Sequence, residues 1–248
     1  MGDGLSSFLY GAVGGGLVAT LLRVFEQYWV APWLTSSAEA KHKLVLYGRP
    51  LYLGCHQLEF RLTHIGLQQQ QERSNGIESL KCSLSEARSL EWFTKNGYYL
   101  TSSAYVIACV AAWISLYQRD VVFLPFRHKS LAAQFFNLIE RFKITVSTKT
   151  ILWYHYIDGI GELLVETGHD RPMPFSRFSE KLFTDLPFRQ YYDQLFQFLQ
   201  QVGAGEYREH IGQTVIAVRD IKRFLADNDV VPVIEAYDHL PSDSKAAG

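Results

Sequence analysis

The stretch from Gly4 to Leu22 contains no charged residue and lies at the very start of the chain. A helix over this stretch would be roughly 28 Å long, close to the hydrocarbon thickness of a bilayer. Charged and amphipathic residues of the kind found at membrane interfaces follow it: Arg23, Glu26, Tyr28, Trp29 and Trp33. We therefore expect residues 1–34 to form a membrane anchor with its interfacial segment.

Other interpretations of this stretch stay open. A cleaved signal peptide fits poorly, because the start Met1-Gly2-Asp3 lacks the positive region that such peptides carry. A helix buried in the core of a soluble protein is an alternative. Gly2 and Ser6 also match the loose myristoylation pattern, although the acidic Asp3 directly after the glycine argues against it.

Charge asymmetry predicts the orientation of the anchor. Asp3 alone precedes the uncharged stretch, whereas four basic residues follow it: Arg23, Lys41, Lys43 and Arg49. Positive residues stay on the cytoplasmic side, so the bulk of the chain should be cytoplasmic. The three cysteines, Cys55, Cys82 and Cys109, form no CxxC pair and suit a reducing compartment.

The rest of the chain has the composition of a folded domain. Hydrophobic residues make up 48% and aromatic residues 14% of the sequence, which is too apolar for a disordered chain. The net charge of −1 gives no electrostatic reason to bind nucleic acid. We expect one domain over residues 35–240 and a disordered tail over residues 241–248.

Apolar residues recur at three- and four-residue spacing through most of this domain, which predicts helices. Leu51, Cys55, Leu58, Leu62 and Ile65 show this spacing in the first of them. The predicted helices cover about 37–71, 85–93, 98–122, 130–142, 151–165, 188–198 and 211–225, with an exposed linker at 68–76. Strand signals are limited to 43–47 and 230–234. The predicted fold class is all-α: an N-terminal transmembrane helix followed by a cytoplasmic multi-helix bundle.

Residues 96–118 form a second uncharged run that is long enough to span a membrane. The run also contains polar residues and tyrosines: Asn96, Thr101, Ser102, Ser103, Ser115, Gln118 and four tyrosines. This density suits the central helix of a water-soluble bundle better. A second membrane span remains the alternative.

Small residues in the anchor, Gly11, Gly15 and Ala19, fall at four-residue spacing. Such a face lets two membrane helices approach closely, which would give a dimerisation or partner-binding surface. Glycine is also common in membrane helices for other reasons, so both interpretations stand.

Five polar residues are the best candidates for a chemical site. His155, Asp158 and Glu162 share one face of a predicted helix, but the apolar residues of that helix lie opposite them, as on an ordinary surface helix. His56 and Glu59 show the reverse of the ExxH order that di-metal carboxylate bundles use. We therefore predict no catalytic residue, no metal site and no cofactor.

Three segments resemble a poorly characterised group of mostly bacterial helical proteins. They are Gly48 to Leu62, Ser103 to Leu124, and the Ile-Gly-Glu-Leu element at 160–163. The resemblance implies a single N-terminal membrane helix and an all-α domain, and it implies no activity. Cys55 and His56 depart from the pattern, since the group more often has small or polar residues there.

The sequence favours an interaction or scaffold protein that recruits or assembles partner proteins at the cytoplasmic membrane face. Its expected partners are the lipid bilayer and another protein or a second copy. The alternative is a membrane-associated enzyme or ligand sensor in which His56, Glu59, His155 and Glu162 converge between helices. A structure separates the two, because an enzyme site would bring these side chains together.

Overall fold

The computed structural model describes residues 31–71, 76–86, 89–121, 129–228 and 230. Every regular element in these ranges is a helix, apart from one isolated bridge between Val165 and Pro172. The all-α prediction is therefore confirmed for the described part of the chain. Residues 1–30, with the predicted small-residue face of Gly11, Gly15 and Ala19, lie outside it, and so does the predicted tail at 241–248.

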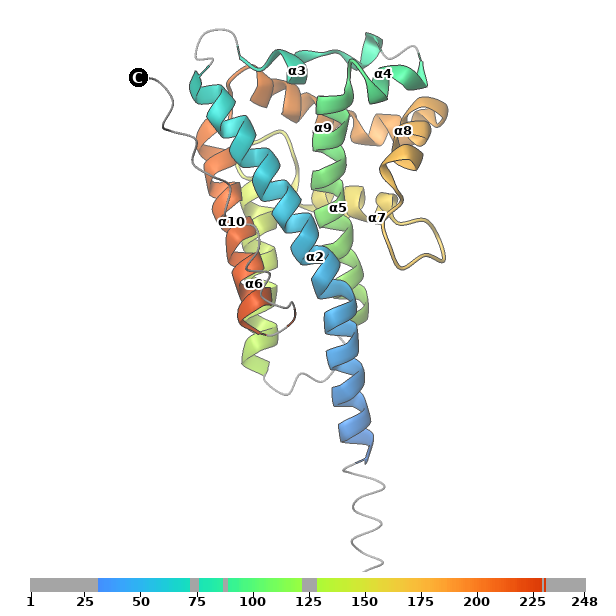
Figure 1. Ribbon diagram of the computed structural model, residues 1–248, viewed down its shortest axis with the longest axis vertical. Coiled ribbons are helices and arrows are strands. Elements are labelled where there is room, and N and C mark those ends of the chain that lie inside the picture. The colour runs from blue at the N-terminus through green and yellow to red at the C-terminus, as the bar shows by residue number, and fades with distance from the viewer. Residues whose placement is uncertain (1–30, 72–75, 87–88, 122–128, 229, 231–248) are drawn as a thin grey trace, which may run out of the picture.

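Helix α2, Ala31–Gln71, is the longest element and runs past the end of the other helices at its N-terminal side (Figure 1). The predicted apolar face of this helix is its core face: Leu51, Cys55, Leu58, Leu62 and Ile65 are all buried. The strand signal at 43–47 is wrong, because these residues continue the helix. A helix of this length spans about 60 Å.

Helix α5, Tyr98–Val121, lies at the centre of the bundle and packs against both α2 and α7 (Figure 1). Its part from Tyr98 to Arg119 is apolar and long enough to cross a membrane, with a mean hydropathy of 1.6. Of the 18 most apolar consecutive residues in this part, 67% are buried inside the protein, as in a core helix. The polar Thr101, Ser102 and Ser103 are buried with it.

Five helices form a closed ring in which each contacts the next. Helix α2 contacts α10, Arg208–Asp227, and α10 contacts α6, Lys129–Ser147. Helix α6 contacts α7, Tyr154–Leu164. Helix α7 contacts α5, which packs against α2 and closes the ring. The ring closes because each helix is apolar on the side that faces inward. On α6, for example, Phe135, Ile139 and Phe142 are buried, while Phe136 is exposed.

Two further helices cover one end of the ring. Helix α8, Phe175–Thr184, leads directly into α9, Leu186–Gly203, whose first turn is capped by the Asp185 carboxylate accepting a hydrogen bond from Phe188 N at 3.0 Å. Three aromatic side chains pack together here: the Phe178 ring lies edge-on to both Phe188 and Tyr192, and the last two rings are tilted against each other. The periodicity of the sequence did not indicate α8.

Short elements connect α2 to α5: α3, Glu78–Lys81, the 3₁₀ turn η2, Leu84–Glu86, and α4, Leu90–Thr94. The predicted single helix at 85–93 is wrong, since two short elements occupy this stretch. The predicted linker at 68–76 is wrong at its start. Gln69 belongs to α2, is buried, and donates a 2.7 Å hydrogen bond to the Val202 carbonyl.

Candidate functional site

His56 and Glu59 lie together on α2 and face α10. The Glu59 carboxylate accepts hydrogen bonds from Lys222 at 2.8 Å and from Arg219 at 2.5 Å. Lys222 Nζ also lies 3.2 Å from His56 Nδ1. An ammonium group has only protons to donate, so this contact requires Nδ1 of His56 to be the acceptor. The cluster joins two helices whose residues are 160 and more positions apart in the sequence.

The charge state of Glu59 follows from this cluster. Burial opposes ionisation of the carboxyl, but the hydrogen bonds and charges of Lys222 and Arg219 outweigh it and hold its pKa below the ordinary value. A carboxylate held ionised by two cations is a weak general base. Glu59 therefore serves as a structural clasp between α2 and α10.

We expect Glu59→Gln to destabilise the protein by about 1–2 kcal/mol at pH 7. Because the folded-state pKa is lowered, the ionised carboxylate stabilises the fold above its unfolded pKa, and this contribution disappears as the pH falls through the folded pKa. Urea unfolding at pH 7, 5 and 3.5 should show the gap between wild type and variant closing toward the lowest pH. The matched control is Glu162→Gln, an exposed carboxylate, for which we expect a change within about 0.5 kcal/mol. A gap that persists unchanged at pH 3.5 would contradict the assignment.

The other three predicted residues lie on α7 and have different surroundings. Asp158 forms a 2.8 Å ion pair with Lys143 of α6, whose side chain is only 5% exposed. His155 is exposed and packs edge-on against the Tyr154 ring. Glu162 is exposed and lines a separate surface hollow with Arg119, Glu166 and His169. Asp158 is therefore partly exposed and paired with a neighbouring helix, whereas His155 and Glu162 are exposed.

The structure therefore divides the five predicted residues among separate places. His56 and Glu59 face α10, whereas His155, Asp158 and Glu162 lie on α7, and α5 packs against both of these helices. The described residues contain no group of three or more histidine, cysteine or acidic side chains placed to hold a metal ion. The thiol of Cys55 is fully buried, and burial raises its pKa to about 12, so it is a poor nucleophile.

The feature of α2 that stands out is an apolar row on its outer side. Leu46, Leu53, Phe60 and Leu67 follow one another at seven-residue intervals, and they are 45%, 52%, 65% and 51% exposed. We call these four side chains the α2 ladder. Single exposed apolar residues are normal on protein surfaces. These four are distinguished by their regular seven-residue interval along one helix, which is the length of the heptad repeat found where helices pack together.

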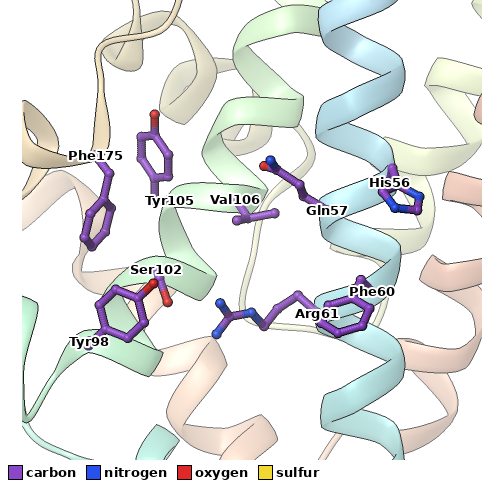
Figure 2. Close-up of a pocket in the computed structure, with 9 residues that line it drawn as sticks. All are labelled: His56, Gln57, Phe60, Arg61, Tyr98, Ser102, Tyr105, Val106 and Phe175. Atoms are coloured by element: carbon purple, nitrogen blue, oxygen red, sulfur yellow. The ribbon is translucent and has the colours of Figure 1, made fainter. Parts of the chain in front are cut away.

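A hollow of about 490 Å³ lies beside the middle of the ladder, between α2, α5 and the start of α8. Figure 2 shows Gln57 and Arg61 extending from α2 toward this hollow, and His56 and Phe60 complete its lining from the same helix. Opposite them stand Tyr98, Tyr105 and Phe175. The Phe175 ring packs edge-on against both tyrosines, with centroids 5.8 and 5.3 Å apart, which fixes an aromatic wall.

Arg61 supplies the positive charge of this hollow. Its guanidinium lies 4.4 Å from the centroid of the Tyr99 ring and donates a 3.3 Å hydrogen bond to Ser103 Oγ. Within the described residues no carboxylate forms an ion pair with it. A half-buried arginine held by an aromatic face and a hydroxyl retains donors for an anionic group.

No protein family, curated protein or solved structure matches this chain. The resemblance to the group of bacterial helical proteins therefore stays an expectation. The functional assignment below depends on the geometry of α2 and its neighbours.

The sequence pattern alone did not indicate the ladder, Arg61 or Phe175 as a site. One signal was present: leucine or phenylalanine at 46, 53, 60 and 67. A seven-residue row of this kind also occurs on buried helices, so only the exposure of its members distinguishes it from a core face.

Proposed function

We propose that this protein is a helical adaptor, held at the cytoplasmic face of a membrane by its N-terminal segment, that recruits partner proteins to that surface. The observation that carries the proposal is the α2 ladder, an apolar row left uncovered on the longest helix of the bundle. The uncharged stretch at 4–22 supports the membrane location, and it precedes α2 in the chain.

The enzyme alternative has less support. Of its predicted residues, Glu59 is engaged by two cations and Asp158 by Lys143. The set does not surround a common cavity in the described part of the chain. An adaptor requires an exposed binding surface on a rigid scaffold and no such convergence.

Fractionation of cells that express the full chain tests the membrane location. After ultracentrifugation without detergent, we expect the protein in the membrane pellet, and we expect it to resist extraction by alkaline carbonate. The double variant Leu53→Ser/Phe60→Ser should pellet equally, because it alters the ladder and leaves residues 1–34 intact. In mild detergent, wild type should migrate as a complex larger than the chain itself, and the double variant should lose that complex.

Two results would overturn the adaptor proposal. One is recovery of wild type in the supernatant without detergent, which would show that the protein is not held at a membrane. The other is a complex of the same size and yield for wild type and double variant, which would show that the ladder does not bind the partner. Circular dichroism of both proteins serves as the control for folding.

A further inference from the structure

We propose that the α2 ladder and the adjacent hollow bind an amphipathic helix of a partner protein, and that this helix is acidic along both sides of its apolar face. One large apolar or aromatic side chain of the partner enters the hollow, beside a carboxylate that pairs with Arg61. The proposal deepens the adaptor function and rests on it.

The dimensions of the ladder fit a helix. Successive rungs lie two turns apart, or about 10.5 Å, so four rungs extend over roughly 31 Å. A partner helix of about three heptads would cover them all. Helices that dock in grooves are held by apolar anchors at spacings of three, four and seven residues, which matches a row with a seven-residue period.

The charges around the ladder select an acidic partner. Over residues 45–71 of α2, Glu59 is the only acidic residue, and Lys222 and Arg219 already bind it. The basic and imidazole side chains of α2 over this stretch are Arg49, His56, Arg61 and His64. A second copy would bring these cationic and imidazole groups against each other without a carboxylate between them. Acidic residues on both sides of a partner helix complement them.

The hollow adds a place for an anchoring side chain. Its volume of about 490 Å³ lies within the range of pockets that enclose a small molecule. The wall formed by Tyr98, Tyr105 and Phe175 is held in place by edge-on ring packing. Large side chains that fill such pockets near the centre of an interface usually contribute most of the binding free energy. Phe60 and Arg61 line this hollow from α2, so the anchor would insert near the middle of the ladder.

Site-specific photo-crosslinking in the native cells tests the proposal on the full chain. The variants Leu53→benzoylphenylalanine and Phe60→benzoylphenylalanine place a photoreactive group on the ladder. The matched controls are Phe183→benzoylphenylalanine and Ile216→benzoylphenylalanine, at apolar residues that are 44% and 49% exposed on α8 and α10. Mass spectrometry then identifies the crosslinked segment. The cells express two differently tagged copies of the chain, so that a crosslink between two copies can be recognised.

The expected result is that both ladder positions crosslink to one segment of another protein and the controls do not. That segment should have apolar residues at helical spacing, flanked by Asp and Glu. A synthetic peptide of this segment should bind the full chain in detergent about tenfold more tightly than the same peptide with Gln and Asn in place of the acids. Arg61→Gln should abolish most of this difference, whereas Arg223→Gln, an exposed arginine on α10, should preserve it.

Crosslinks to a segment of another protein without acidic flanks would overturn the proposal while leaving the adaptor function standing. Equal binding of the acidic and neutral peptides would overturn it as well. Crosslinks to a second tagged copy, to residues 231–248 of the same chain or to lipid would overturn both, because the ladder would then bind no partner protein. Crosslinking at the ladder no greater than at the controls would reject both this inference and the ladder as a binding surface.

Discussion

Replacing Gly161 with alanine should lower the free energy of unfolding by about 2–4 kcal/mol. Gly161 lies on α7 where that helix crosses α5. A Cβ atom there would lie 2.6 Å from the Ala111 carbonyl carbon, 2.7 Å from its oxygen and 2.8 Å from Ala112 N. These atoms are backbone, so the two helices must move apart to admit the methyl group.

The control for this prediction is Gly212→Ala on α10. No atom lies within 4 Å of the position that its Cβ would take. Since alanine favours the helix over glycine, this variant should gain up to about 1 kcal/mol. Urea unfolding of the full chain in mild detergent, followed by circular dichroism, measures both. Equal stabilities for the two variants would show that α5 and α7 do not make this close approach.

Replacing Asp158 with alanine should lower the free energy of unfolding by about 2–4 kcal/mol, because it leaves Lys143 buried without its nearest counter-charge. Burial opposes the charge on Lys143, but the hydrogen bond and charge of Asp158, and then the charge of Glu140, outweigh it and raise the pKa of the ammonium group. Glu140 lies farther away, at 3.6 Å, and also accepts a hydrogen bond from Tyr154. It therefore compensates only in part.

Two further variants separate this mechanism from simple loss of contacts. Lys143→Met removes the buried charge together with its need for a partner, so we expect a loss of about 1 kcal/mol or less. Glu180→Ala removes one member of the exposed Arg177–Glu180 pair, in which both side chains are 47% exposed, and should change stability by less than about 0.5 kcal/mol. The same unfolding assay compares all three. If Lys143→Met proves as harmful as Asp158→Ala, the pair acts through packing and not through charge.

The long helices could be predicted from the sequence because their apolar faces keep a regular period. The prediction for 98–122 differs from α5 by one residue at its end, and the first predicted helix ends where α2 ends, at Gln71. The short elements could not be predicted in this way. Helices α4 and α8 contain only 5 and 10 residues, too few for a period to be distinguished from chance.

Gln69 shows why local polarity misled the prediction of a linker. Four consecutive glutamines end α2 and give no apolar pattern. One of them is buried because the Val202 carbonyl, 133 residues further along the chain, accepts its amide proton. The partner of such a group lies outside any window of local sequence, so its burial is invisible to periodicity.

The candidate polar residues show the same limit. The spacing of His155, Asp158 and Glu162 correctly places them on one helix, α7, but says nothing of what stands opposite each of them. Lys143 on α6 pairs with Asp158, which is only partly exposed, while His155 and Glu162 are exposed. Spacing within a helix fixes the direction of a side chain, and only the neighbouring helix decides its environment.

The sequence by itself determined that the described part of this protein is helical and which residues of α2 form the core, because both follow from the 3.6-residue period of a single chain segment. Only the tertiary structure decided that Leu46, Leu53, Phe60 and Leu67 are left uncovered. The physical reason is that periodicity reports that a helix face is apolar, whereas burial depends on whether another helix packs against that face. On α2, the inner face meets α5 and α10, and the ladder remains exposed.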